Sequence, residues 1–553
     1  MESNIMLYLA VYLVIIGIIL LFILSPLSLY LSLRLFRTPD RAKKKILLIS
    51  LALSIPCLGV LSLPEIFEWN LWAGYIIITL LSLGYCAFLS YKIFKAPLIN
   101  SIALSFCYGL LNTLLIFGCL FILSFISRDQ PLEPEAKEWL SAKPAEIAEA
   151  DNLYYSLIGF SAEPNVNPHQ AGLQCVKEFN EYAQKIAIAQ KQRTAMPSFP
   201  AHCSPKSLSY DKKLDILCVV IKADSLARIR SEQSQFDSLI QKYQFLIDNY
   251  IGLAHYSGYS NVAVRGPGSP LLLGHTIIEA HKLFLARTIL NYLKEKRSEE
   301  SLESLQQDMR FQRQNLLRSD NLLFLMVTST LLERDLYLYS QLLDQDIAEK
   351  SFQKGLEIPL LSDKEKDFEK TFQGEFRLTN YYFLPTSLVP ESIKIPSGLP
   401  GFMQKIFFKP NATSNQRFYF YKNIIDWTRL PADKLTSSKI KTLSPPNFWD
   451  VGNNPHGIIL FTIATPAPNY STFIYRLHNL DGLIRLVKIK QRVRHDRIAK
   501  DQIESFLKQD LPYCKNPYTI QPMSWDAKTE TLYFVDPLCE GRKVAVQLPF
   551  PGK

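Results

Sequence analysis

The feature that most constrains this sequence is the gathering of long, uncharged apolar runs in its first 127 residues. Four runs contain no Asp, Glu, Lys, Arg or His, at about residues 5–24, 46–63, 71–91 and 102–126. Each approaches or exceeds the roughly 18 to 20 residues that a helix needs to cross a bilayer. The sequence therefore predicts a four-helix transmembrane anchor over residues 1–127, which excludes a wholly soluble enzyme and a small disulfide scaffold.

The charges between these runs predict which side of the membrane each connection faces. Six bases lie between the first and second runs, namely Arg34, Arg37, Arg41, Lys43, Lys44 and Lys45. Lys92 and Lys95 lie between the third and fourth runs, whereas the second connection holds Glu65 and Glu68 and no base. Because Lys and Arg are retained on the cytoplasmic side, both termini are expected outside the cytoplasm. Only Glu2, and no base, precedes the first run, so we expect an anchor that stays attached and not a cleaved signal peptide.

The chain changes character after residue 127, because 53 of its 61 Lys and Arg residues and 47 of its 51 Asp and Glu residues follow. We expect a charged linker over 128–150, a helical exported region over 151–384, and a smaller α+β region over 385–553 that begins with widely spaced prolines. A multi-span anchor followed by a long helical exported domain resembles uncharacterised inner-membrane proteins of Gram-negative bacteria. That resemblance implies the bacterial inner membrane, with both termini in the periplasm.

Several elements are predicted from local patterns. Apolar residues from Phe236 to Tyr250 recur at helical spacing, and the apolar run 322–332 is too short for a membrane span and indicates a core helix capped by Asp320. Ser362 and Glu365 form a capping-box pattern. Further on, the patterns predict helices over 412–428 and 498–508, a strand over 458–463, and a hairpin of residues 523–525 and 531–535.

The cysteines of the exported region suggest disulfides, since that region would face an oxidising compartment. We expect the pairs Cys203–Cys218 and Cys514–Cys539, each closing a short loop, and Cys175 remains without an assigned partner. Zinc ligation is disfavoured because the chain lacks CxxC and CxxH pairs at ligand spacing. No cofactor and no metal are expected.

The string from His275 through Glu279 to His281 resembles a zinc-protease helix only superficially, because its two histidines are six residues apart and not four. A structural histidine is the simpler interpretation of His281. His275, Glu279 and His255 are the candidate catalytic residues if the chain is a hydrolase.

The densest basic run includes a possible anion-binding face of Lys488, Arg492, Arg494 and Arg497. A solvated helix face is the alternative interpretation. Outside the cytoplasm the expected anionic partners are lipid head groups, cell-wall polymers or an acidic protein, and not nucleic acid.

Together these features predict a non-enzymatic envelope protein whose periplasmic region acts as a scaffold or binding module, in contact with membrane lipids and a protein or cell-envelope partner. Two alternatives stay open. One is an envelope hydrolase with a site formed by distant residues. The other is a transport or export accessory protein that acts through a polar cavity at Asn112.

Overall fold

The computed structural model describes residues 129–192, 195, 197–200, 203, 225–264, 269–293, 298–345, 358–380, 408–435, 454, 457–458, 470–537 and 542–550. The four expected transmembrane runs lie outside these residues. None of the helices among these residues has the length and hydropathy of a membrane span. The chain divides into two compact units, and the larger one comprises Glu133–Ile395, Arg417–Lys441 and Asn469–Lys553.

The larger unit begins with α5 (Pro134–Ser141), the 3-10 turn η2 (Glu149–Asp151), α6 (Leu153–Ile158) and the long α7 (Pro168–Gln192). In α5, Trp139 is buried and packs edge-on against Phe376, with ring centroids 5.6 Å apart. The segment expected to be a linker over 128–150 is therefore partly helical and packed.

Two glycines set the close crossing of α6 and α7. A Cβ atom on Gly172 would lie 1.8 Å from the carbonyl oxygen of Tyr155, and one on Gly159 would lie 2.0 Å from the carbonyl oxygen of Pro168. Any larger residue would push the two backbones apart, so the absence of a side chain is what allows this contact.

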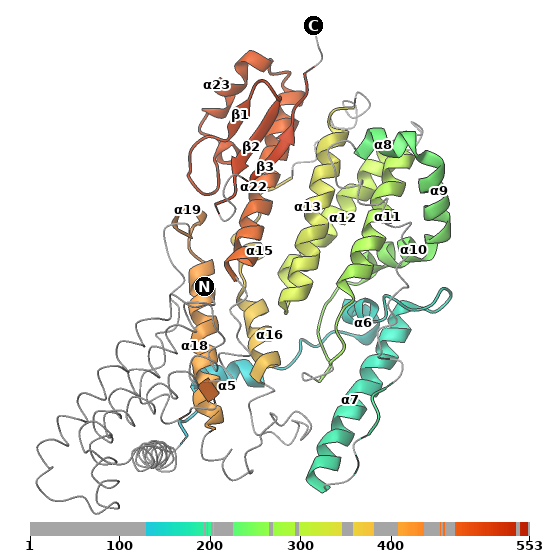
Figure 1. Ribbon diagram of the computed structural model, residues 1–553, viewed down its shortest axis with the longest axis vertical. Coiled ribbons are helices and arrows are strands. Elements are labelled where there is room, and N and C mark those ends of the chain that lie inside the picture. The colour runs from blue at the N-terminus through green and yellow to red at the C-terminus, as the bar shows by residue number, and fades with distance from the viewer. Residues whose placement is uncertain are drawn as a thin grey trace, which may run out of the picture. The chain divides into compact units, whose positions relative to one another are not determined.

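The central bundle contains α8 (Ser225–Ser231), α9 (Gln233–Lys242), α10 (Gln244–Gly252), η5 (Leu253–His255), α11 (Gly274–Leu293), α12 (Ser298–Arg318) and α13 (Leu322–Leu342), green to yellow in Figure 1. Helix α11 packs against α8, α9 and α10 and also against α12 and α13. It is therefore covered on most sides, and its residues Ala280 to Ala286 are all buried.

Two sequence predictions in this bundle need correction. The stripe from Phe236 to Tyr250 is largely buried, but the backbone leaves helical geometry at Tyr243 (φ −110°, ψ 23°), so it forms two helices and not one. The core helix predicted at 322–332 is confirmed as α13. Its N-cap is Asn321, whose side-chain oxygen accepts a hydrogen bond from the Phe324 N–H, and not Asp320.

The rest of the chain adds α15 (Asp363–Lys366), α16 (Glu369–Asn380), α18 (Pro410–Thr428), α19 (Ala432–Leu435), α22 (Tyr470–His495), η7 (Lys500–Gln502), α23 (Ile503–Leu507) and η8 (Pro512–Cys514). The capping box of Ser362 and Glu365 and the helix at 412–428 are confirmed. The helix expected over 498–508 is only partly formed, as η7 and α23. Ile458 lies in a helical turn, and the rest of the strand expected over 458–463 lies outside the described residues.

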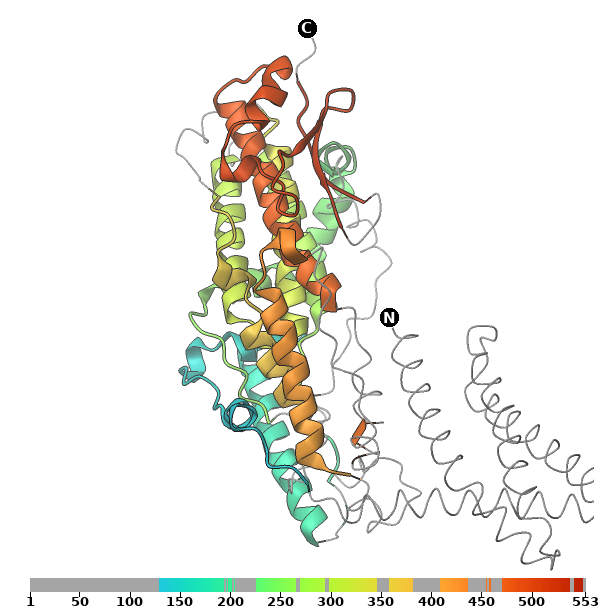
Figure 2. The same ribbon diagram turned by 90° about the vertical axis from the view of Figure 1, so that its left-hand side faces the viewer.

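A small antiparallel sheet ends the described chain, in the order β1 (Ser524–Asp526), β2 (Thr531–Val535) and β3 (Lys543–Gln547). The predicted hairpin is confirmed, with Trp525 opposite Leu532, while β3 was not anticipated. The sheet lies beside α22 (Figures 1 and 2). Phe534 fits there because Gly482 presents no Cβ, which would lie 2.4 Å from the phenyl ring.

In the smaller unit the described residues include the start of α18. The Asp129 carboxylate accepts hydrogen bonds from the backbone N–H groups of Asn411 (3.0 Å) and Ala412 (3.1 Å). Free N–H groups and the helix dipole both favour a carboxylate at this position. Asp129 therefore fixes the beginning of α18.

Candidate functional site

The central bundle buries a cluster of one histidine and two aspartates, one from each of three helices. His281 comes from α11, Asp308 from α12 and Asp335 from α13, and the side chains of His281 and Asp335 are completely inaccessible to solvent. Each residue is on the buried side of its helix. The packing of α11 against α12 and α13 therefore brings the three together from distant parts of the sequence.

Short polar contacts connect the cluster. His281 Nε2 lies 2.7 Å from Asp335 Oδ1 and 3.4 Å from Asp308 Oδ2. The Tyr250 hydroxyl, from α10, lies 2.9 Å from both oxygens of Asp308 and donates to that carboxylate. Gln312 Nε2 donates to the Tyr250 hydroxyl oxygen (2.8 Å) and to Asp308 Oδ1 (3.0 Å).

Burial shifts the pKa values of the cluster away from their ordinary values. Burial, with the neighbouring Asp308 adding to it, raises the pKa of Asp335 to about 8. Burial alone would lower the pKa of His281, but the two aspartates outweigh it and raise that pKa. Two buried carboxylates side by side are costly to keep ionised, so the cluster must take up protons or another cation.

Two atoms of the cluster have no hydrogen-bond partner among the described residues. They are His281 Nδ1 and Asp335 Oδ2, and both are buried. A buried polar atom without a partner costs about 1–3 kcal/mol, which makes such atoms informative. The nitrogen and carboxylate oxygens of His281, Asp308 and Asp335 lie within 4.8 Å of one another, close enough that a small movement would let them hold one metal ion.

The catalytic candidates predicted from sequence are not part of this cluster. His275 is at the exposed start of α11, with Nε2 3.9 Å from Glu279 Oε1. Glu279 is buried and accepts a hydrogen bond from Lys282 Nζ at 2.7 Å. His255 is exposed in η5. Sequence reasoning judged His281 structural and missed Asp308 and Asp335 entirely.

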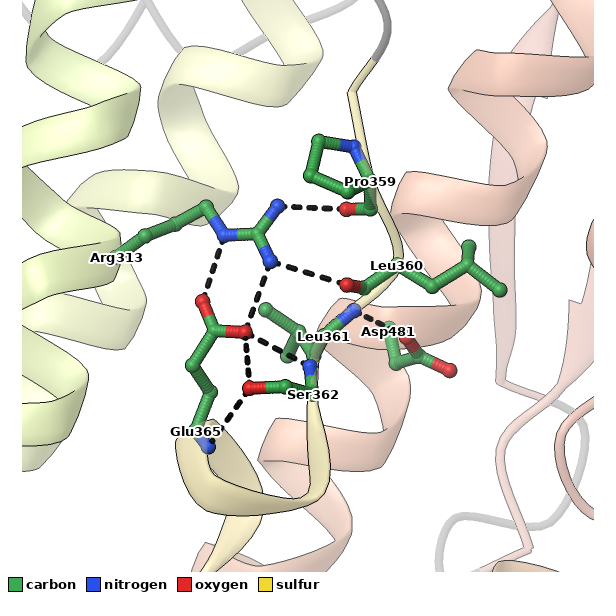
Figure 3. A network of polar contacts seen from close by, with 7 residues as sticks. All are labelled: Arg313, Pro359, Leu360, Leu361, Ser362, Glu365 and Asp481. Carbon is green, nitrogen blue, oxygen red and sulfur yellow. Dashed lines mark hydrogen bonds and ion pairs between the residues drawn. The ribbon is translucent and has the colours of Figure 1, made fainter.

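A second polar network joins α12 and α22 through α15 and the segment before it (Figure 3). The Arg313 guanidinium makes two hydrogen bonds to the Glu365 carboxylate, 2.7 Å from Nε and 2.8 Å from Nη2, and also donates to the carbonyls of Pro359 and Leu360. Asp481 of α22 accepts from the Leu361 N–H at 2.9 Å. All the hydrogen bonds drawn there are made between groups of the chain itself, so we interpret the network as structural.

The expected anion-binding face on α22 is largely engaged within the chain. Arg494 Nη2 donates to Asp344 Oδ1 (2.8 Å), and Arg492 pairs with Asp496 at 3.3 Å. Lys488 Nζ lies 5.3 Å from the centre of the Tyr513 ring. Arg497 is exposed in the turn after the helix, with a positive φ of 54°. The four bases do not form one free face, and Arg494 in particular binds a carboxylate of its own chain.

The cysteines also differ from expectation. Cys203 is bonded to Cys175, with Cα atoms 5.0 Å apart, and not to Cys218, which lies outside the described residues. Sequence spacing favoured the nearer cysteine, whereas the chain folds the segment after α7 back onto that helix. Cys514 is buried and forms no disulfide with another described residue. Cys539 lies outside them, so the pair Cys514–Cys539 stays a prediction.

A polar pocket lies between α11 and α12 and is lined by Arg287, Thr288, Asn291, Glu300, Ser301 and Ser304. None of the catalytic candidates lines it. Comparison with known protein families, curated proteins and solved structures finds no match to this chain.

Proposed function

We propose that this chain is a membrane-anchored protein of the bacterial inner membrane whose large periplasmic region is a non-enzymatic scaffold for a protein or cell-envelope partner. The anchor is inferred from the four uncharged runs, and the periplasmic location from the bases between them. Membrane lipids are then the partner of the anchor, and nucleic acid is not expected.

The observation that carries the binding part of this proposal is helix α7. Among the described elements it packs mainly against α6, and its C-terminal end points away from the central bundle in both views (Figures 1 and 2). Ile188, near that end, is 55 % exposed, and Phe199, in the segment that follows, is 41 % exposed. Phe199 packs edge-on against Tyr182 of α7, with ring centroids 5.4 Å apart. Ile188 on the helix and Phe199 on the segment packed against it each leave a large apolar side chain exposed, and surface of this kind is what protein partners cover.

The start of α7 is held firmly, as a binding arm requires. His169 Nδ1 lies 3.0 Å from Ser156 Oγ of α6, and His169 Nε2 lies 2.9 Å from the carbonyl oxygen of Glu149. The imidazole also stacks on the Tyr256 ring at 4.9 Å. The N-terminal end of α7 is therefore fixed in place, so less conformational entropy is lost when its C-terminal end binds a partner.

Site-specific photo-crosslinking in cells tests this role. A photoreactive amino acid at Ile188 should give a discrete adduct with a partner. The matched control is the same amino acid at Lys177, 60 % exposed on the same helix but about three turns away. Absence of an adduct at both Ile188 and Phe199 in correctly folded protein would refute binding through α7.

The location is tested separately. A reporter that works only in the periplasm should be active when it is fused after Ser127. A reporter that works only in the cytoplasm should be inactive there, and the opposite result would overturn the predicted orientation. Mass mapping of thiols in cell extracts should find Cys175 and Cys203 linked, because disulfides persist chiefly in oxidising compartments.

The hydrolase alternative rests on one contact, the approach of His275 Nε2 to Glu279 Oε1 at 3.9 Å. Replacement of His275, Glu279 and His255 by Ala should leave the cellular phenotype unchanged if the scaffold proposal is right, and loss of the phenotype with normal protein levels would favour the hydrolase. The transport alternative depends on Asn112, which lies outside the described residues.

A further inference from the structure

We propose that His281, Asp308 and Asp335 form a binding site for one divalent transition-metal ion of the Zn²⁺ class. The site belongs to the central bundle and is independent of the partner surface proposed for α7. It uses one residue from each of three helices, so a bound ion would tie α11, α12 and α13 together.

The distances between donor atoms fit a small ion after a modest adjustment. Metal bonds to imidazole nitrogen and carboxylate oxygen are about 2.0–2.2 Å long, so two ligands of a tetrahedral ion lie about 3.4 Å apart. His281 Nε2 is already 3.4 Å from Asp308 Oδ2. It is 2.7 Å from Asp335 Oδ1, so that pair must open by roughly 0.7 Å to admit the ion. Rotation of a carboxylate supplies a movement of this size without a shift of the helices.

Charge balance favours the ion. Asp308 and Asp335 bring two negative charges into a site that excludes water, and Tyr250 and Gln312 are neutral donors. A protonated His281 would balance one of the two charges, whereas a divalent cation bound to the neutral imidazole balances both. Buried charges are found paired or bound to metal for this reason.

The surroundings of Asp308 also resemble those of a metal-bound carboxylate. Asp308 is held by the Tyr250 hydroxyl and by Gln312 Nε2, contacts of the kind that orient a coordinating carboxylate. Asp335 Oδ2 also points to a bound ion, because it is fully buried and has no hydrogen-bond donor among the described residues. Bidentate coordination by Asp335 would satisfy this oxygen.

The mixture of one imidazole and two carboxylates identifies the class of ion. Mixed nitrogen and oxygen ligands suit Zn²⁺, Co²⁺ and Mn²⁺. Ca²⁺ prefers six to eight oxygen ligands and Mg²⁺ keeps several waters, and a site enclosed by packed helices provides neither. Because the side chains are sealed, the ion must enter during folding, so metal exchange should be slow.

Metal analysis of the purified full-length chain tests the proposal. Protein produced in medium supplemented with Zn²⁺ should retain about one zinc per chain after dialysis against a chelator. Protein produced with Co²⁺ should show visible d–d absorption typical of four-coordinate cobalt with nitrogen and oxygen ligands. Unfolding in the presence of a chelator, followed by refolding without metal, should lower the melting temperature.

Two variants and one control distinguish loss of the metal ligands from a general loss of core packing. His281→Gln and Asp335→Asn should each lower the metal content at least tenfold while the helical circular dichroism is kept. Asp320→Asn is the matched control, since Asp320 is also buried and accepts from a tyrosine hydroxyl, Tyr259, at 2.9 Å; it should keep the metal. Wild-type protein without bound zinc or cobalt would overturn the proposal, and so would zinc retained by both site variants. If a variant fails to fold, the metal content and cobalt spectrum of the wild type decide the question.

Discussion

Replacing Arg313 should destabilise the protein far more than the loss of an ordinary surface ion pair. Its guanidinium makes two hydrogen bonds to Glu365 and two to backbone carbonyls, and the side chains of Arg313 and Glu365 are only 16 % and 6 % exposed. In Arg313→Met the Glu365 carboxylate would stay buried with only the Ser362 N–H and hydroxyl as donors. Leaving a buried charge without its partner costs about 3–5 kcal/mol.

The pair as a whole is worth much less than this. Arg313→Met combined with Glu365→Leu removes both charges, and replacing a buried pair by apolar groups is often close to neutral. The double variant should therefore be more stable than Arg313→Met alone, with a coupling energy of about 2–3 kcal/mol. The remaining cost of the double variant comes from four lost hydrogen bonds: those from Arg313 to the carbonyls of Pro359 and Leu360, and those from the Ser362 N–H and hydroxyl to Glu365.

Urea unfolding of the purified full-length chain, followed by circular dichroism, measures these differences. Arg429→Met is the matched control, because Arg429 also binds two carboxylates, those of Asp367 and Glu369, but is 47 % exposed. Exposed pairs contribute at most about 1 kcal/mol. If Arg313→Met and Arg429→Met lose the same small amount of stability, burial is not what makes the Arg313 network matter, and the reasoning is wrong.

Three further predictions follow from the structure. Burial, and then Lys366, lowers the pKa of His478 to about 4. Between that value and the ordinary 6.5 the unfolded chain binds more protons at this residue, so the contribution of His478 to stability should fall by about 2 kcal/mol from pH 7 to pH 5. Asp335 and His281, whose pKa values are raised, contribute in the opposite direction, so the test is a difference: in unfolding curves the wild type should lose about 2 kcal/mol relative to His478→Gln between pH 7 and pH 5. Gly172→Ala should cost about 1–3 kcal/mol because its Cβ would strike the Tyr155 carbonyl, whereas Gly252→Ala, which meets nothing within 4 Å, should leave the melting temperature unchanged or higher. Cys175→Ser should cost about 3 kcal/mol more under non-reducing conditions than with a reductant, because the bond closes a chain segment of 28 residues.

Local signals in the sequence were sufficient for some elements. The capping box at Ser362, the helix over 412–428 and the hairpin around residues 526–530 depend on residues close together in the chain, and the structure has all three. The break at Tyr243 was not visible, because the apolar spacing continues across it without a proline or glycine. Tertiary packing of α9 and α10 against α11 decides that geometry.

Helix α22 shows why a charge run is hard to interpret. Its residues Leu480 to Ile484 are all buried, so it has no single apolar face for a periodicity to reveal. Lys490, in the middle of the basic run, is 1 % exposed and donates to Asp344 (2.6 Å) and to the carbonyl oxygen of Gln547 (2.7 Å). Asp344 is 146 residues away in sequence. Nothing local distinguishes such a lysine from one that faces water.

The His281 cluster was missed for a related reason, yet one signal for it exists. Motif searches rely on short spacings within one helix, whereas a bundle site takes one residue from each helix. Asp335, however, comes four residues after Leu331 and four before Tyr339, and both of these are buried. Residues four apart share a helix face, so Asp335 occupies a position that the pattern of α13 assigns to an apolar side chain. Burying an unpaired charge at such a position costs too much free energy for the fold to tolerate. A charged residue within an otherwise buried stripe therefore predicts a buried partner or a bound cation, even before the partner helices are known.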